Sequence, residues 1–190
     1  MDDNDQIRVT PRQLRALSHP LRTRMLGLLR TEGPATATSL GARLGESSGA
    51  TSYHLRQLAA HGFIEEDPEH TVRGRERWWR AVHARTMVDA KEFMGDPETS
   101  RALDLFFHTV LDDHMQRVAA FVSEKDDWHQ PWIDAADISD AWLRLTPERA
   151  KQLNAELHSV LDRYRDDASA DSPEAEQVVV GIQLFPRRTS

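Results

Sequence analysis

Apolar residues recur at three- and four-residue intervals over residues 20 to 32, which is the period of an amphipathic helix. The buried stripe of this helix is expected to hold Leu21, Met25, Leu28 and Leu29. Pro20 suits the first helical turn, and Gly33-Pro34 is expected to end the helix. The pattern predicts a half-buried helix that needs neighbouring elements on one side.

Two shorter helices are predicted on either side of this one. The first begins at Thr10-Pro11-Arg12-Gln13, where a Thr N-cap, a Pro at the first helical position and a Gln at the third make a capping box. It runs as far as Leu17. The second is capped by Thr36 and stops at Gly45.

The segment SSGATSYHLRQLAAHG, residues 47 to 62, predicts a further helix directly after this turn, ending at Gly62. A helical period of about 100° per residue divides its side chains between two faces. The inward face is expected to hold Ala50, Thr51, Leu55 and Leu58. The outward face then holds Ser48, Gly49, Ser52, Tyr53 and Arg56. Two helices joined by a tight turn form a helix-turn-helix pattern.

Two strands are predicted next, over residues 63 to 66 and 75 to 82, around the polar loop DPEHTVRG. A hairpin that directly follows the second helix is a wing. Its loop places Arg73 and Arg75 near the tip.

A long helix is predicted from Pro97 to about Glu124. Its apolar stripe consists of Leu103, Phe107, Val110, Leu111, Met115, Val118 and Val122. This stripe is too long for a domain of some 80 residues to cover, so the helix needs a partner surface. After it, residues 138 to 145 (ISDAWLRL) and 177 to 185 (QVVVGIQLF) resemble strands, on either side of a helix capped by Thr146. The predicted fold class is α+β, mainly helical: a winged helix-turn-helix, a long dimerisation helix and a small strand-helix-strand module.

Charge is distributed unevenly along the chain, whose formal net charge is −7. Residues 10 to 91 hold 13 Lys and Arg against 8 Asp and Glu, a balance of +5. Residues 92 to 190 hold 10 against 20, a balance of −10, and residues 1 to 9 carry −2. The two halves are therefore expected to meet different partners.

Composition excludes several classes of protein. There is no Cys, which removes disulfides, thiol catalysis and thiolate metal sites. No run of about 18 apolar residues is present, and the acidic start lacks the basic and apolar regions of a signal peptide. We expect a cytoplasmic protein that does not enter a membrane.

Two stretches, ALSHPLRTRMLGLLRTEG and SLGARLGESSGATSYHLRQLAAHGFIEE, resemble the winged helix-turn-helix of the ArsR-type transcriptional repressors. The similarity covers roughly Thr10 to Val82 and includes the helix start HPLR, the turn and second helix, the exit HGFI and the Arg-bearing wing. Beyond Val82 the likeness is only to members with an enlarged C-terminal part.

The resemblance implies a homodimer that binds a double-stranded DNA operator, with the second helix of each subunit in a major groove. The implied DNA-binding residues are Ser48, Gly49, Ser52, Tyr53, Arg56, Arg73 and Arg75. Small residues allow close approach, hydroxyls and helix N-terminal amides suit phosphates, and Arg56 or Tyr53 can reach base edges. The implied organisation is a disordered acidic tail over 1–9, a DNA-binding domain over 10–82, and a dimerisation and candidate effector-sensing module over 83–190.

Catalysis is not expected. A hydrolase would need Ser52 or Ser48 activated by His54, yet Ser52 and His54 diverge on a helix and the chain has no GxSxG motif. No cofactor is expected either.

Metal sensing is an alternative, because many ArsR-type repressors release DNA when a metal binds. One family site uses cysteines where this chain has Thr36 and Thr38. For the other, Asp112-Asp113-His114 supplies one half, but the matching His-x-x-Glu is missing. The weak candidates for Zn²⁺ or Ni²⁺ are Asp104, His108, Asp112 and His114.

Aromatic residues of the C-terminal part resemble the lining of a small-molecule pocket, although plain core packing would explain them too. The candidate pocket residues are Phe107, His108, Trp128, Trp132 and Trp142. The preferred interpretation is a repressor released by an effector, with a small organic ligand favoured. A metal-responsive repressor and a winged-helix protein-protein adaptor without DNA binding are the alternatives.

Overall fold

A computed structural model describes residues 6–70, 76–164, 167, 170 and 172–187. The chain divides into two compact units, Met1–Val122 and Ser123–Ser190. The boundary therefore lies at the end of the long helix rather than at Val82, since that helix packs with the N-terminal elements. In the described part, no helix has the length and apolar character that a membrane span requires.

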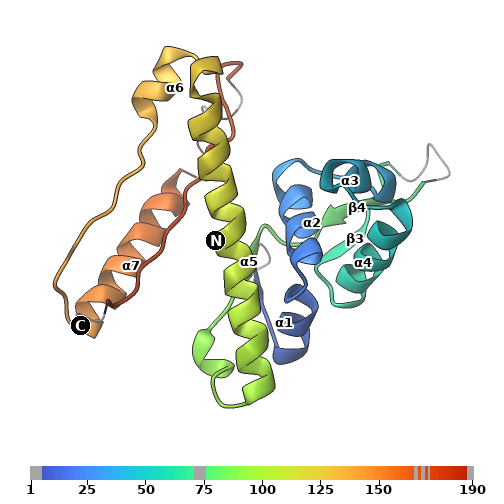
Figure 1. Ribbon diagram of the computed structural model, residues 1–190, viewed down its shortest axis with the longest axis horizontal. Helices are drawn as coiled ribbons and strands as arrows, with labels where there is room; N and C mark the ends of the chain where they lie inside the picture. Colours follow the sequence, from blue (N-terminus) through green and yellow to red (C-terminus); the bar gives the residue numbers. More distant parts are fainter. Residues whose placement is uncertain (1–5, 71–75, 165–166, 168–169, 171, 188–190) are drawn as a thin grey trace. The chain divides into compact units, whose positions relative to one another are not determined.

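Four helices form the N-terminal part of the first unit (Figure 1). They are α1 (Pro11–Leu17), α2 (Pro20–Thr31), α3 (Ala37–Leu44) and α4 (Ser48–Ala60). The capping box predicted at Thr10 and Gln13 is confirmed, because the Thr10 side chain accepts from the Gln13 N–H while the Gln13 side chain accepts from the Thr10 N–H. Thr36 caps α3 in the same way, and Gly45 ends it with φ +69°.

The wing belongs to a three-stranded antiparallel sheet in the order β2-β4-β3. Its strands are β2 (Ala35–Thr36), β3 (Ile64–Glu66) and β4 (Trp78–Ala81), with Glu65 opposite Arg80. The hairpin predicted after α4 is confirmed: β3 begins one residue later than expected, and β4 is shorter than expected at both ends. Arg73 and Arg75 lie outside the described residues.

A second, two-stranded sheet was not predicted. Strand β1 (Gln6–Arg8) pairs in parallel with β5 (Arg85–Met87), and Val9 after it is almost fully buried. The expectation of a disordered tail over residues 1–9 is therefore wrong for residues 6–9. Three residues are too few for a periodic signal, and their partner lies some 80 positions away in the chain.

The long helix α5 spans Pro97–Glu124, as predicted. One side packs on the N-terminal core and buries Thr99, Leu103, Phe106 and Thr109. The predicted single apolar stripe is divided: Leu103 and Val110 face this core, whereas five residues lie on solvent and are between 38% and 63% exposed, namely Phe107, Leu111, Met115, Val118 and Val122. We call these five the open face of α5.

The second unit contains the 3-10 turn η3 (Lys125–Asp127) and the helices α6 (Gln130–Ala135) and α7 (Pro147–Arg163). The strands predicted over 138–145 and 177–185 are wrong, because neither segment is a strand or pairs with another described segment. β-Propensity reflects packing within a sheet, and it has no effect on a segment that lacks a neighbouring strand. The strand-helix-strand module is thus a helical unit with irregular segments.

Candidate nucleic-acid interface

The turn between α3 and α4 depends on close backbone approach. The Glu46 N–H donates to the Gly41 carbonyl at 2.9 Å. A Cβ atom at Gly41 would lie 2.8 Å from the Glu46 carbonyl oxygen and 3.1 Å from Thr51 Oγ1. Only glycine therefore lets the turn pack this tightly on α3, which fixes the direction in which α4 leaves.

Helix α4 is held in place by its N-cap and its inward face. Ser47 accepts from the Ala50 N–H at 3.2 Å, and the Thr51 hydroxyl donates to the Ser47 carbonyl at 2.9 Å. Thr51, Leu55 and Leu58 are fully buried, while Ala50 is only half-buried. The predicted division of faces is therefore confirmed for three of the four inward residues.

The predicted outward residues of α4 form one continuous surface. Ser48, Gly49, Tyr53 and Arg56 are exposed, and Ser52 is half-buried. Arg56 makes no hydrogen bond or ion pair with any described residue, so its guanidinium is available to a partner. Within the N-terminal third of the helix the side chains are small, which allows close approach of a ligand.

A hollow of about 380 Å³ lies between this surface and the base of the wing. We call it the wing groove; it is lined by Ala37, Thr38, Ser48, Ser52, Arg56, Glu76, Arg77 and Trp79. The Thr38 hydroxyl donates to Glu76 at 2.8 Å and so links α3 to the wing. The sequence did not predict Thr38, Glu76 and Arg77 as members of this surface, because they lie outside α4 in the sequence and come beside it only in the folded chain.

Two arginines on the described part of the wing are neutralised by neighbours. Arg77 pairs with Glu66 at 3.1 Å, and Arg80 pairs with Glu65 across the strands at 2.7 Å.

Asp67, at the end of β3, is buried, which alone would raise its pKa. Hydrogen bonds from the Glu69 N–H and from His70 outweigh burial and hold that pKa below its ordinary value.

A second hollow of about 370 Å³ lies on the other side of α4. We call it the basic hollow; it is lined by Arg12, Arg15, Ala16, Arg22, Gln57 and His61. None of these residues is acidic. The predicted site did not include it, because its members come from α1, α2 and α4 and show no spacing pattern in the chain.

His54 packs against His19, the N-cap residue of α2, rather than beside Ser52. Its ring centroid lies 4.3 Å from that of His19, and its buried Nδ1 has no hydrogen-bond partner among the described residues. Ser52 instead lines the wing groove. Burial, and then the charges of His19 and Arg22, lower the pKa of His54; burial and Arg22 lower that of His19.

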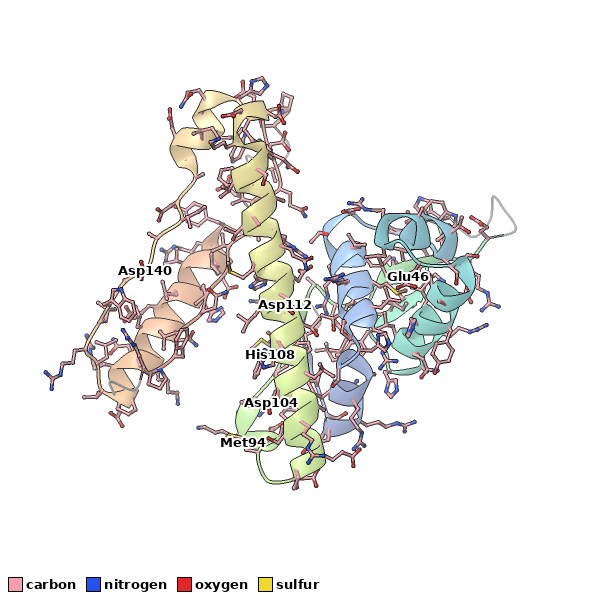
Figure 2. The ribbon with its side chains drawn as sticks, viewed as in Figure 1. Glu46, Met94, Asp104, His108, Asp112 and Asp140 are labelled. Atoms are coloured by element: carbon pink, nitrogen blue, oxygen red, sulfur yellow. The ribbon has the colours of Figure 1, made fainter. Side chains whose placement is uncertain are left out.

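The candidate metal ligands on α5 do not converge. Asp104, His108 and Asp112 follow one another along the helix (Figure 2), and the first and last are separated by a rise of about 12 Å. That distance is too long for all three to share one ion. His114 is half-buried on the same helix. Among the described residues, no group of three or more His, Asp or Glu side chains could hold a metal ion.

The candidate effector residues fall in different units of the chain. Phe107 and His108 are exposed on α5 in the first unit. In the second unit, Trp128 precedes α6 and Trp132 lies within it. Trp142 is 73% exposed, with the Arg187 guanidinium 5.2 Å from its ring centroid. Within the described chain, an exposed Trp142 is not the wall of an enclosed pocket.

Comparison with known protein families gives one finding for the N-terminal part. A family model described as a helix-turn-helix domain matches residues 17–67. These residues include α2, α3, α4 and β3, with the turn at Gly45 between the two helices of the motif. No curated protein matches the chain. Residues 17–67 are thus a helix-turn-helix domain, a module typical of DNA-binding transcription regulators.

Proposed function

We propose that this protein is a DNA-binding transcriptional regulator of the ArsR type, acting as a repressor on a near-palindromic operator. The observation that carries the proposal is the outward face of α4, where Arg56, which pairs with no described residue, stands beside small residues and a hydroxyl-lined groove. In this proposal α4 enters the major groove and Arg56 or Tyr53 contacts base edges. Ser48, Gly49 and Ser52 approach the phosphates.

The acidic balance of the whole chain does not oppose this function. Several arginines are neutralised by carboxylates. Arg8, Arg43 and Arg80 do not line the wing groove beside α4, and Arg77 does. Arg56 pairs with no carboxylate of the described residues, so its positive charge is available where α4 would meet DNA. The acidic residues of the second unit lie in another part of the chain.

We further propose a homodimer formed through the open face of α5. Five large apolar side chains along one side of this helix remain exposed in the part of the chain that the structure describes. Exposed apolar surface of this extent is costly in water, and a second copy offers an identical face for a twofold contact. Such a dimer would place two α4 helices on half-sites about one turn of DNA apart.

An effector that releases DNA remains part of the proposal, with a small organic ligand favoured over a metal. The non-converging carboxylates of α5 support this preference. The effector would act by binding one dimer arrangement better than the other, because only such a difference changes DNA affinity. The ligand site would lie in the C-terminal part, around Trp128 and Trp132.

Selection of fragments from the protein's own genome tests the function directly. The regulator is expected to enrich a small set of fragments that share a near-palindromic sequence. A protein-protein adaptor would enrich none, which would refute DNA recognition. Repeating the selection with Ni²⁺, Zn²⁺ and a panel of metabolites distinguishes a metal effector from an organic one, since only the true effector abolishes enrichment.

A further inference from the structure

The basic hollow carries a positive charge that the fold does not neutralise. Arg12 makes no hydrogen bond or ion pair with any described residue. Arg15 meets Glu98 only at 3.4 Å, between exposed side chains, and such an ion pair is weak. Arg22 is fixed by backbone carbonyls, donating through Nε to Ala16 and through Nη2 to Arg15.

The histidine of the hollow responds to this charge. Burial lowers the pKa of His61, and the charges of Arg12 and Arg22 lower it further. The His61 carbonyl accepts from the Gln13 side chain at 3.1 Å, which fixes the end of α4 against α1. The three arginines therefore surround a hollow whose lining contains no acidic side chain.

The hollow and the wing groove lie on opposite flanks of α4. Ser52 lines the wing groove and Gln57 lines the basic hollow. The two residues are five positions apart, so their side chains point about 140° apart around the helix axis. The outward face with Tyr53 lies between the two flanks.

We propose that the basic hollow is a second phosphate-binding surface, which holds the DNA strand on the side of α4 opposite to the wing. The inference rests on the proposed function. A helix with its side chains is about 10–12 Å wide and fills a major groove of about 12 Å, so a sugar-phosphate strand runs along each flank. The wing groove meets one strand, and Arg12 and Arg15 meet the other. These contacts fix the position of α4 and carry no sequence preference.

The salt dependence of operator binding tests this surface in the full-length protein. Arg12→Gln with Arg15→Gln is compared with Arg8→Gln with Arg24→Gln, a matched control that removes the same charge from residues contacting Asp89, Glu92 and Gln116. The slope of log K against log salt is negative, and each lost phosphate contact reduces its magnitude by about 0.9. The double variant should lower it by about 1.8, and the control should leave it unchanged. Thermal unfolding confirms that each variant is folded.

A scan with neutral methylphosphonate linkages locates the contacted phosphates. At the phosphates that the hollow contacts, a neutral linkage should weaken DNA binding by the wild type about as much as the two Arg→Gln substitutions weaken binding to unmodified DNA. Neutralisation then has no further effect on the double variant itself. An additive loss at every position overturns the proposal.

Inorganic phosphate is the probe for the other source of the same chemistry. Calorimetry measures whether the wild type binds inorganic phosphate without DNA and whether Arg12→Gln abolishes this binding. If both hold and the salt slope of the double variant is unchanged, the hollow serves a free phosphate and the DNA assignment is overturned. A wild type that binds no DNA at all overturns both the function and this inference. Wild-type DNA binding with an unchanged slope in the double variant overturns the inference alone.

Discussion

At the scale of single residues, the surroundings of each polar group decide its role. Arg43 and Arg80 each hold a carboxylate and serve the fold, whereas Arg56 and Arg12 hold none among the described residues and are proposed to contact DNA. His54 lies on the same helix as Arg56 but contacts His19 and has a buried Nδ1. Its place is in the contact between helices rather than in a reactive dyad.

The two packed histidines make stability depend on pH. The groups that act on the pair are Arg22, which lowers both pKa values, and Glu46, which opposes it; Tyr53 packs edge-on against His54. Because each folded pKa lies below the unfolded value of about 6.5, the unfolded chain binds more protons between the two values. Stability is full above about pH 7 and is lost as the pH falls through the folded pKa values.

His54→Gln should therefore flatten this dependence. Melting temperatures measured between pH 7.5 and 5 are expected to fall less for the variant than for the wild type. His158→Gln, at an exposed position on α7, should keep the wild-type profile. Equal profiles for His54→Gln and the wild type would remove His54 as a cause.

At the scale of elements, the turn before α4 depends on Gly41. Gly41→Ala would place a Cβ 2.8 Å from a backbone oxygen that cannot move without shifting the turn. We expect a loss of about 1–3 kcal/mol in the free energy of unfolding, measured by denaturant titration. Gly49→Ala, where the added Cβ meets nothing within 4 Å, is the control. A Gly41→Ala protein as stable as the control would show that the turn relaxes freely.

The open face of α5 should control dimerisation. Leu111→Glu is expected to produce a monomer in analytical ultracentrifugation, because a charge would be buried in the apolar contact. Leu105→Glu is the matched control: Leu105 is 47% exposed on the same helix, but its side chain points about 120° from Leu111. Dimers that persist in Leu111→Glu, or dissociate equally in both variants, would assign the contact elsewhere.

Elements whose signals are local were predictable from the sequence. Their signals depend only on residues a few positions away in the chain. Examples are the capping residues Thr10 and Thr36, the left-handed Gly45 and the period of α5. Strand β1 and the two absent strands depend on distant partners, which periodicity does not reveal. The outward face of α4 follows from helical geometry, whereas the basic hollow needs α1 and α4 to meet in space.

At the scale of the whole molecule, the long helix belongs to the unit that contains the helix-turn-helix domain. Phe93, Leu103 and Phe106 join the same buried cluster as Leu14 and Leu55. A cut after Val82, the boundary expected from the sequence, would remove these three residues from the core. The second unit, by contrast, buries no residue of its helices α6 and α7.

Deletion of residues 123–190 should therefore leave a folded protein that still dimerises and binds the operator, with at most a small change in affinity. Response to the effector should disappear, since the candidate ligand residues around Trp128 are gone. Calorimetric unfolding and fluorescence anisotropy measure the two properties. An unfolded or monomeric product would mean that the second unit supports the first.

The central claim is that the outward face of α4 binds DNA. Its most direct test is fluorescence anisotropy of a genomically selected fragment with Arg56→Ala, with Arg24→Ala as a control of equal charge. Arg56→Ala is expected to lose about 1–3 kcal/mol of binding free energy, with relaxed base preference at one position of each half-site or a shallower salt dependence. Arg24→Ala is expected to bind as the wild type does. Equal affinity and specificity for Arg56→Ala and the wild type across several salt concentrations would contradict this claim.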